Sequence, residues 1–191
     1  MSPILGIWAS QNYVRFTNSF ESIQTVSLGA SQTTITFSSI PSTYKHLQIR
    51  YLTRTTSASG DQGNVNMTFN SDTGANYATH RLAGNGSIAV ATAATSQTSI
   101  LSGIAARDGE PSNVFGAGII DILDYTNTNK YTTIRTLTGE DANSGADEYI
   151  GLHSGLWMNT AAITSITLTA QGGNNFAQYS HFALYGIKVA S

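Results

Sequence analysis

The sequence has no cysteine and few charged residues. Lysine, arginine, aspartate and glutamate together make up 10% of the 191 residues, against roughly 25% in typical soluble domains. The absence of cysteine excludes disulfide cross-links and thiolate metal sites. Because so few side chains are charged, threonine, serine, asparagine, glutamine and glycine must cover most of the surface.

Three further features are missing. The net charge is −2 with no cluster of Lys and Arg, which argues against a nucleic-acid partner because phosphate binding needs clustered positive charge. No apolar run approaches the roughly 18 residues of a membrane span. The N-terminus, MSPILGIWASQ, lacks the positively charged start of a signal peptide and is too short for one. A virion component, released by lysis rather than by ordinary secretion, fits this combination.

The residues that are present favour β-structure. The clearest pattern is a strand–turn–strand unit over 115–139, FGAGIIDILDYTNTNKYTTIRTLTG. Its turn is rich in Thr and Asn, and its second half is rich in β-branched residues, which favour pleated surfaces. We expect this hairpin to be central in a sheet. Asp121 is predicted to pair with Arg135 across the hairpin, and Asp124 is predicted to act as an acceptor in the turn.

Alternation of apolar and polar residues predicts further strands. Their expected ranges are 24–28, 33–39, 45–54, 64–69, 77–82, 98–104, 149–157, 165–170 and 179–189. The last range is apolar on both faces, which indicates a strand that is buried on both sides or lines a subunit contact. We expect it to pair with the hairpin at 115–139. No amphipathic helix and no internal repeat is evident.

These patterns predict an all-β fold. We expect an antiparallel β-sandwich of the jelly-roll type, in which two Greek keys of four strands form the core and surplus strands extend the sheets. The domain is assigned to residues 21–191, and residues 1–20 are assigned to an extended N-terminal arm.

The arm is apolar without a clean period. One interpretation is a first strand, or a segment that lies over the domain's own core; the other is an arm that docks onto a neighbouring subunit. The candidate interface residues are Ile4, Leu5, Ile7, Trp8, Tyr13, Val14 and Phe16.

The sequence contains no convincing catalytic or metal-binding constellation. The four histidines, His46, His80, His153 and His181, show no metal-ligand spacing, and no G-x-S-x-G elbow is present. Acidic residues are too few to favour a paired-carboxylate glycosidase. Two weak cation candidates are the loop 140–148, with Asp141, Asn143 and Asp147, and the group Asn70, Asp72 and Asn76. We predict that the protein is not an enzyme and needs no cofactor.

Several segments resemble a family of small virion structural proteins of tailed bacteriophages, including those that infect cyanobacteria. The resembling segments are TNSFESIQTV (17–26), SSIPSTYKHLQIR (38–50), FNSDTGANYATHRLAGNGS (69–87), GIIDILDYTNTNKYTTIRTLTG (118–139), SGLWMNTAAITSITL (154–168) and NFAQYSHFALYGIK (175–188). The resemblance implies a non-enzymatic part of the phage particle and supplies no catalytic motif.

This resemblance and the expected jelly roll lead to one main hypothesis. The protein is expected to be a capsid cement or decoration protein that forms a homotrimer on the capsid exterior and binds the major capsid protein. The alternative is a tail-fibre or baseplate β-domain that recognises a host surface glycan through loops at 55–63, 84–95 and 140–148. A carbohydrate-binding module of a larger system is disfavoured by the lack of a signal peptide.

Overall fold

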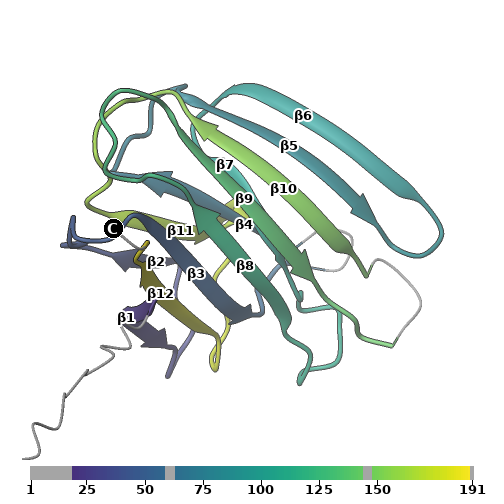
Figure 1. The fold of residues 1–191 in the computed structure, drawn as a ribbon. Helices are drawn as coiled ribbons and strands as arrows, with labels where there is room; N and C mark the ends of the chain where they lie inside the picture. Colours follow the sequence, from purple (N-terminus) through teal and green to yellow (C-terminus); the bar gives the residue numbers. More distant parts are fainter. Residues whose placement is uncertain (1–18, 59–62, 144–147, 190–191) are drawn as a thin grey trace, which may run out of the picture.

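The computed structural model describes residues 19–58, 63–143 and 148–189, and these residues form two packed antiparallel sheets (Figure 1). The strands are β1 Phe20–Ser27, β2 Thr34–Phe37, β3 His46–Thr53, β4 Gly63–Phe69, β5 Tyr77–Gly84, β6 Ala89–Gln97, β7 Ile100–Ala105, β8 Gly116–Ile122, β9 Thr132–Gly139, β10 Ile150–Trp157, β11 Ile166–Ala170 and β12 His181–Ile187. A short 3₁₀ turn, η1, covers Gln171–Gly173. In this part of the chain no helix is long and apolar enough to cross a membrane.

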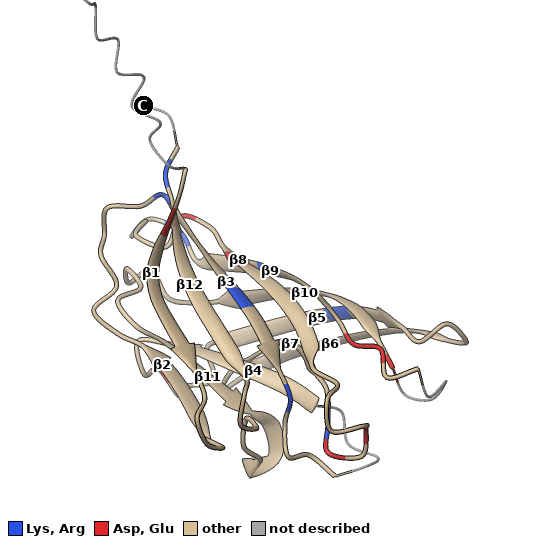
Figure 2. Ribbon diagram, turned by 90° about the horizontal axis from the view of Figure 1, so that it is seen from below, with Lys and Arg blue, Asp and Glu red and all other residues tan. Residues whose placement is uncertain are grey.

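The two sheets have the jelly-roll order with an extension. The large sheet has eight strands in the order β1-β12-β3-β8-β9-β10-β5-β6, and the small sheet has four in the order β2-β11-β4-β7. The first four strands of the large sheet, β1, β12, β3 and β8, face the small sheet. Together these eight strands have the order of two interlocked Greek keys. The β5–β6 pair lies in the chain between β4 and β7, and the β9–β10 pair between β8 and β11. Both pairs extend the large sheet beyond β8, which confirms the predicted sandwich with surplus strands (Figure 2).

The predicted hairpin is the centre of the large sheet. β8 and β9 are its fourth and fifth strands, and Asp121 lies opposite Arg135 with an oxygen–nitrogen distance of 3.5 Å. The carbonyl of Asp124 accepts a hydrogen bond from the Asn127 amide, as expected of a turn. Its carboxylate meets two lysines instead of turn amides, Lys45 at 2.8 Å and Lys130.

Two expectations about neighbouring segments were wrong. The last strand, β12, does not pair with the hairpin: it lies between β1 and β3, and β3 separates it from β8. The range 84–95 is not a loop, because a turn at 84–88 leads directly into β6. For β12, the residues show which structure the segment favours, while long-range backbone pairing decides which segment lies beside it. For 84–95, the small side chains of β6 give too little apolar contrast to predict a strand.

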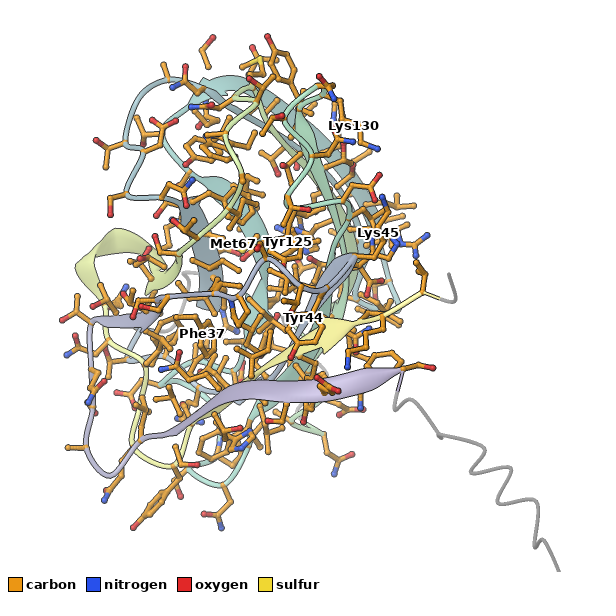
Figure 3. The ribbon with its side chains drawn as sticks, turned by 60° about the vertical axis from the view of Figure 1, so that its left-hand side comes forward. Phe37, Tyr44, Lys45, Met67, Tyr125 and Lys130 are labelled. Atoms are coloured by element: carbon orange, nitrogen blue, oxygen red, sulfur yellow. The ribbon has the colours of Figure 1, made fainter. Side chains whose placement is uncertain are left out.

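The core lies between the two sheets. Phe37 and Met67 of the small sheet are fully buried in it (Figure 3), and Trp157 of β10 packs against Phe69 and stacks on Tyr77, with ring centroids 5.4 and 6.4 Å apart. Under the extension, β7 is the strand of the small sheet that packs against β8, β9 and β10. The opposite face of the large sheet is therefore left as a wide surface.

Candidate functional site

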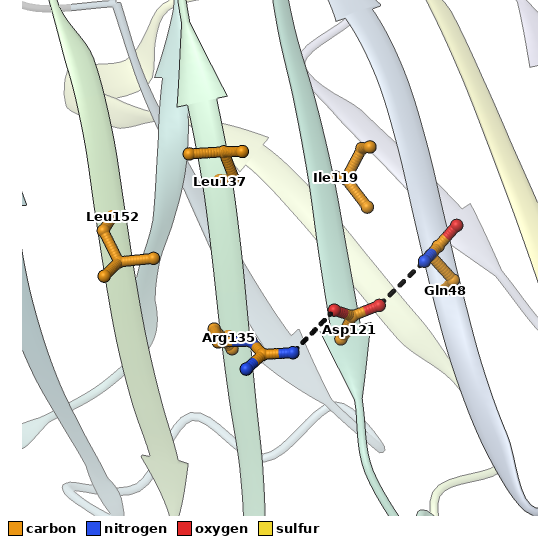
Figure 4. Close-up of a pocket in the computed structure, with 6 residues that line it drawn as sticks. All are labelled: Gln48, Ile119, Asp121, Arg135, Leu137 and Leu152. Carbon is orange, nitrogen blue, oxygen red and sulfur yellow. Dashed lines mark hydrogen bonds and ion pairs between the residues drawn. The ribbon is translucent and has the colours of Figure 1, made fainter.

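The strongest candidate is the face of the large sheet that is turned away from the small sheet, called here the outer face. Four large apolar side chains lie directly opposite one another across it, one on each of four adjacent strands. They are Leu82 on β5, Leu152 on β10, Leu137 on β9 and Ile119 on β8, with exposed fractions of 55, 47, 56 and 40%. We call this set the apolar row; three of its members are drawn in Figure 4.

The apolar row arises because two central strands have their faces reversed relative to ordinary amphipathic strands. On β9, Thr136 and Thr138 point inward and are buried, while Leu137 between them is exposed. On β10, His153 is buried and Leu152 is exposed. Since strand side chains alternate strictly, burying the threonines and the histidine forces the leucines outward. Contiguous apolar side chains on an open surface are typical of interaction sites.

A polar margin borders the apolar row on one side. The carboxylate of Asp121 accepts a hydrogen bond from the Gln48 amide at 2.8 Å and meets the Arg135 guanidinium at 3.5 Å. Together with Ile119, Leu137 and Leu152, these three residues line an open hollow of about 530 Å³ (Figure 4). The polar groups are already paired with one another, so the hollow offers apolar contact and a fixed rim rather than free charges.

On its other side the apolar row continues into more apolar surface. Leu52 of β3 and Ile150 of β10 are 48 and 65% exposed, and each lies two residues along its strand from the line of the apolar row. The outer face thus combines apolar surface with polar residues at its margins, an arrangement suited to protein contact.

The histidines do not come together as a site. His153 is fully buried, and burial together with the neighbouring Arg81 lowers its pKa to about 4. The Nδ1 atom of His46 accepts a hydrogen bond from the Asp124 amide at 3.0 Å, and His80 and His181 are exposed on β5 and β12. Among the described residues, no three His, Asp or Glu side chains are placed to hold a metal ion.

The two candidate cation groups have structural roles in the described residues. The Asp72 carboxylate accepts hydrogen bonds from Trp157 Nε1 at 2.8 Å and from Asn76, whereas Asn70 binds the backbone of the 164–165 segment. They therefore do not form one ligand set. In the acidic loop, Asp141 accepts a hydrogen bond from the Asn143 amide, and Asp147 lies outside the described residues.

A buried ionic cluster lies where β9 ends. Glu110 and Arg107 are both buried, with 3.4 Å between Oε1 and Nε. Burial, reinforced by the nearby Glu110 carboxylate, raises the pKa of Glu140 to about 8, although Arg107 opposes the shift. A neutral Glu140 beside this ion pair is an acid that can lose its proton near neutral pH.

The candidate interface residues of the arm, Ile4, Leu5, Ile7, Trp8, Tyr13, Val14 and Phe16, lie outside the described residues. The residue patterns of the sequence do not predict the apolar row. A signal was present in β10, where Ile150, Leu152 and Leu156 alternate with Gly151, His153 and Gly155, but alternation alone does not show which set faces the core.

The fold and this surface define a class: a jelly-roll β-sandwich with an extended large sheet and an open apolar face. No family model, no curated protein and no solved structure matches the chain.

Proposed function

We propose that this protein is a non-enzymatic structural component of a phage virion that binds the outside of the capsid shell through its outer face. The observation that carries the proposal is the apolar row: four large apolar side chains in register on a sheet face that no described element covers. Contacts of this kind fit a protein partner, because they gain stability by burial of apolar area rather than by directional chemistry.

The partner in this proposal is the major capsid protein. Eight strands at about 4.8 Å spacing give a face roughly 35 Å wide, which suits a broad, repeating protein surface better than a small ligand. The low charge of the chain also favours wide polar and apolar contact over ion pairing. The homotrimer and the role of the arm at residues 1–20 remain predictions within this proposal.

One observation favours the alternative, a tail-fibre or baseplate domain that binds a host glycan. The register places Thr53, Gly139 and Gly84 at the same end of the large sheet, so the loops that begin after β3, β9 and β5 leave from one end. There Arg81 lies over the Tyr149 ring, 5.3 Å from its centroid. Loops gathered at one end of a β-sandwich are a common place for recognition.

The test compares Leu137→Lys with Thr133→Lys. Both positions are exposed on the outer face of β9, but only Leu137 belongs to the apolar row. We expect both variants to unfold at the wild-type denaturant midpoint. Occupancy on shells of the cognate major capsid protein should fall at least about tenfold for Leu137→Lys, which corresponds to about 1.4 kcal/mol, and should be unchanged for Thr133→Lys.

Wild-type occupancy by Leu137→Lys would contradict the assignment of the outer face. Copy number in purified particles separates the two virion roles. A copy number comparable with that of the capsid protein supports head decoration, and a copy number comparable with that of a tail component supports the alternative.

A further inference from the structure

Among the described residues, strand β6 is an edge strand, and its stretch from Ala89 to Ala94 lacks the usual protection against pairing. It is the last strand of the large sheet (Figures 1 and 2), and in the part of the chain that the structure describes its one strand partner is β5. Its nine residues, AVATAATSQ, include no charged residue and no proline, and none of them is buried. The backbone groups on its free side form a row of donors and acceptors, which is a template for a further strand.

The opposite edge of the same sheet is protected. β1 carries Glu21, which forms an ion pair with Lys188, and its pairing with β12 shifts register between Ser22 and Gln24. Charged side chains and bulges are ordinary devices that prevent edge-to-edge association. In the small sheet, the edge strand β2 has only four residues. β6 differs from both, because it is long and uncharged, and its own register shift lies near its end: it pairs continuously with β5 from Ala89 to Ala94, and the shift follows between Ala94 and Gln97.

We propose that β6 pairs antiparallel with β6 of a second copy of this chain about a two-fold axis near its midpoint. The side chains favour this occupant. Strands that recruit foreign peptides provide pockets or charges that select the peptide, whereas β6 presents small Ala, Thr and Ser side chains. With the axis near Ala93, alanines and threonines oppose one another, and no like charges or bulky groups meet.

This pairing joins the two large sheets into one. The two-fold axis of an antiparallel strand pair is perpendicular to the sheet, so the outer faces of both copies lie on the same side. Ala91 of β6 lies opposite Leu82, so each apolar row ends at the junction between the copies. The pairing does not depend on what the outer face binds, and it adds to the predicted trimer contact without replacing it.

The affinity between two copies paired through β6 is expected to be moderate, so the fraction of dimer should depend on protein concentration. A single pair of strands buries less than the roughly 1,000 Å² typical of stable complexes, and the small side chains of β6 add little apolar area. Sedimentation of the full chain over a concentration series should therefore show reversible formation of dimers, or of assemblies with an even number of copies where the trimer also forms.

The first test places charge on the edge. In the double variant Ala91→Lys/Ala93→Lys, two exposed alanines on the outer face become lysines. The two copies of position 93 then meet directly across the axis, and position 91 lies diagonal to position 93 of the other copy, so like charges are brought together. We expect the dissociation constant to rise at least about tenfold. The matched control, Thr25→Lys/Ser27→Lys, adds the same charges at exposed positions of β1 and should leave the constant unchanged. Thermal unfolding verifies that both variants are folded.

The second test uses the absence of native cysteine. Ala93→Cys should give disulfide-linked dimers under mild oxidation, and Thr25→Cys on β1 should not. Three results would overturn the proposal: a wild-type chain that stays monomeric at every concentration, an assembly that the lysines on β6 do not weaken, or cross-linking at Thr25 as efficient as at Ala93.

Discussion

At the scale of single residues, a half-buried glutamate and a buried histidine are held in their neutral forms. Burial raises the pKa of Glu140 to about 8 from its ordinary value of 4.5, and burial lowers the pKa of His153 to about 4 from 6.5. Glu140 thus contributes stability that is lost as pH rises towards 8, and His153 contributes stability that is lost as pH falls from 6.5 towards 4. Between pH 6.5 and 8 the folded histidine is neutral and the unfolded one releases only its last half proton, a smaller change of opposite sign, so Glu140 dominates the pH dependence there.

Glu140→Gln tests the acidic member of this pair. The wild-type free energy of unfolding is expected to fall by about 1–2 kcal/mol between pH 6.5 and 8, because the unfolded chain releases a proton that the folded chain retains. The variant should lose most of this dependence, as measured by urea unfolding at several pH values. Asp141→Asn, the same type of change at an exposed neighbour, should retain it. An equal slope for wild type and Glu140→Gln would show that Glu140 is ionised when folded.

At the scale of elements, Tyr51 links β3, β7, β8 and β9. Its hydroxyl is buried and donates to the Ile104 carbonyl at 3.0 Å, and it lies 2.9 Å from the Thr138 hydroxyl. Burial raises the pKa of this hydroxyl. Glycines on two facing strands leave room for the ring: a Cβ atom at Gly118 would lie 2.1 Å from ring carbon Cζ, and one at Gly103 would lie 2.1 Å from the hydroxyl oxygen.

Gly118→Ala is therefore expected to destabilise the fold. The added methyl group meets a rigid, fully packed ring, and overpacking of this kind costs about 1–3 kcal/mol or more. Denaturant unfolding should show a lower midpoint with an unchanged slope. Gly29→Ala is the matched control, because a Cβ atom there meets no atom within 4 Å. If both variants unfold alike, the ring of Tyr51 has room to move that the structure does not show.

At the scale of the whole molecule, the jelly roll supplies the core and the added strands supply surface. Three of the four residues of the apolar row belong to the added strands β5, β9 and β10. β6 is the exposed end of the same extension. Removing the extension would leave the two Greek keys but would remove most of the outer face, so the extension is where the proposed contacts reside.

Deletion of residues 1–16 tests the arm at this scale. The buried core in the described residues begins at Leu28, so the shortened chain should unfold at the wild-type denaturant midpoint while binding capsid shells at least about tenfold more weakly. A full-length Trp8→Ser/Phe16→Ser variant separates the contribution of the arm's apolar side chains to capsid binding from the effect of the arm's length. Normal occupancy of the shortened chain would count against the arm, and loss of folding would show that it belongs to the domain.

Much of the fold could be predicted from local residue patterns. Period-two alternation, as in Val65, Met67 and Phe69, located most of the strands, and the Thr- and Asn-rich turn with its β-branched return marked the central hairpin and the Asp121–Arg135 pair. These signals work because strand formation and turn formation depend mainly on the residues of the segment itself. The strand β6 was not predicted, because its alanines, threonines and serines give almost no apolar contrast between the two faces of the strand.

The strand neighbours and the candidate site depended on tertiary structure. The residues of β12 permit pairing with several strands, and only the long-range register places β3 between it and the hairpin. Leu137 and Leu152 look like core residues in the sequence, but packing against β7 buries Thr136 and His153 instead. Local chemistry determined that this chain forms strands. Which face of each strand is buried, and which residues align across them, followed from pairing between distant segments.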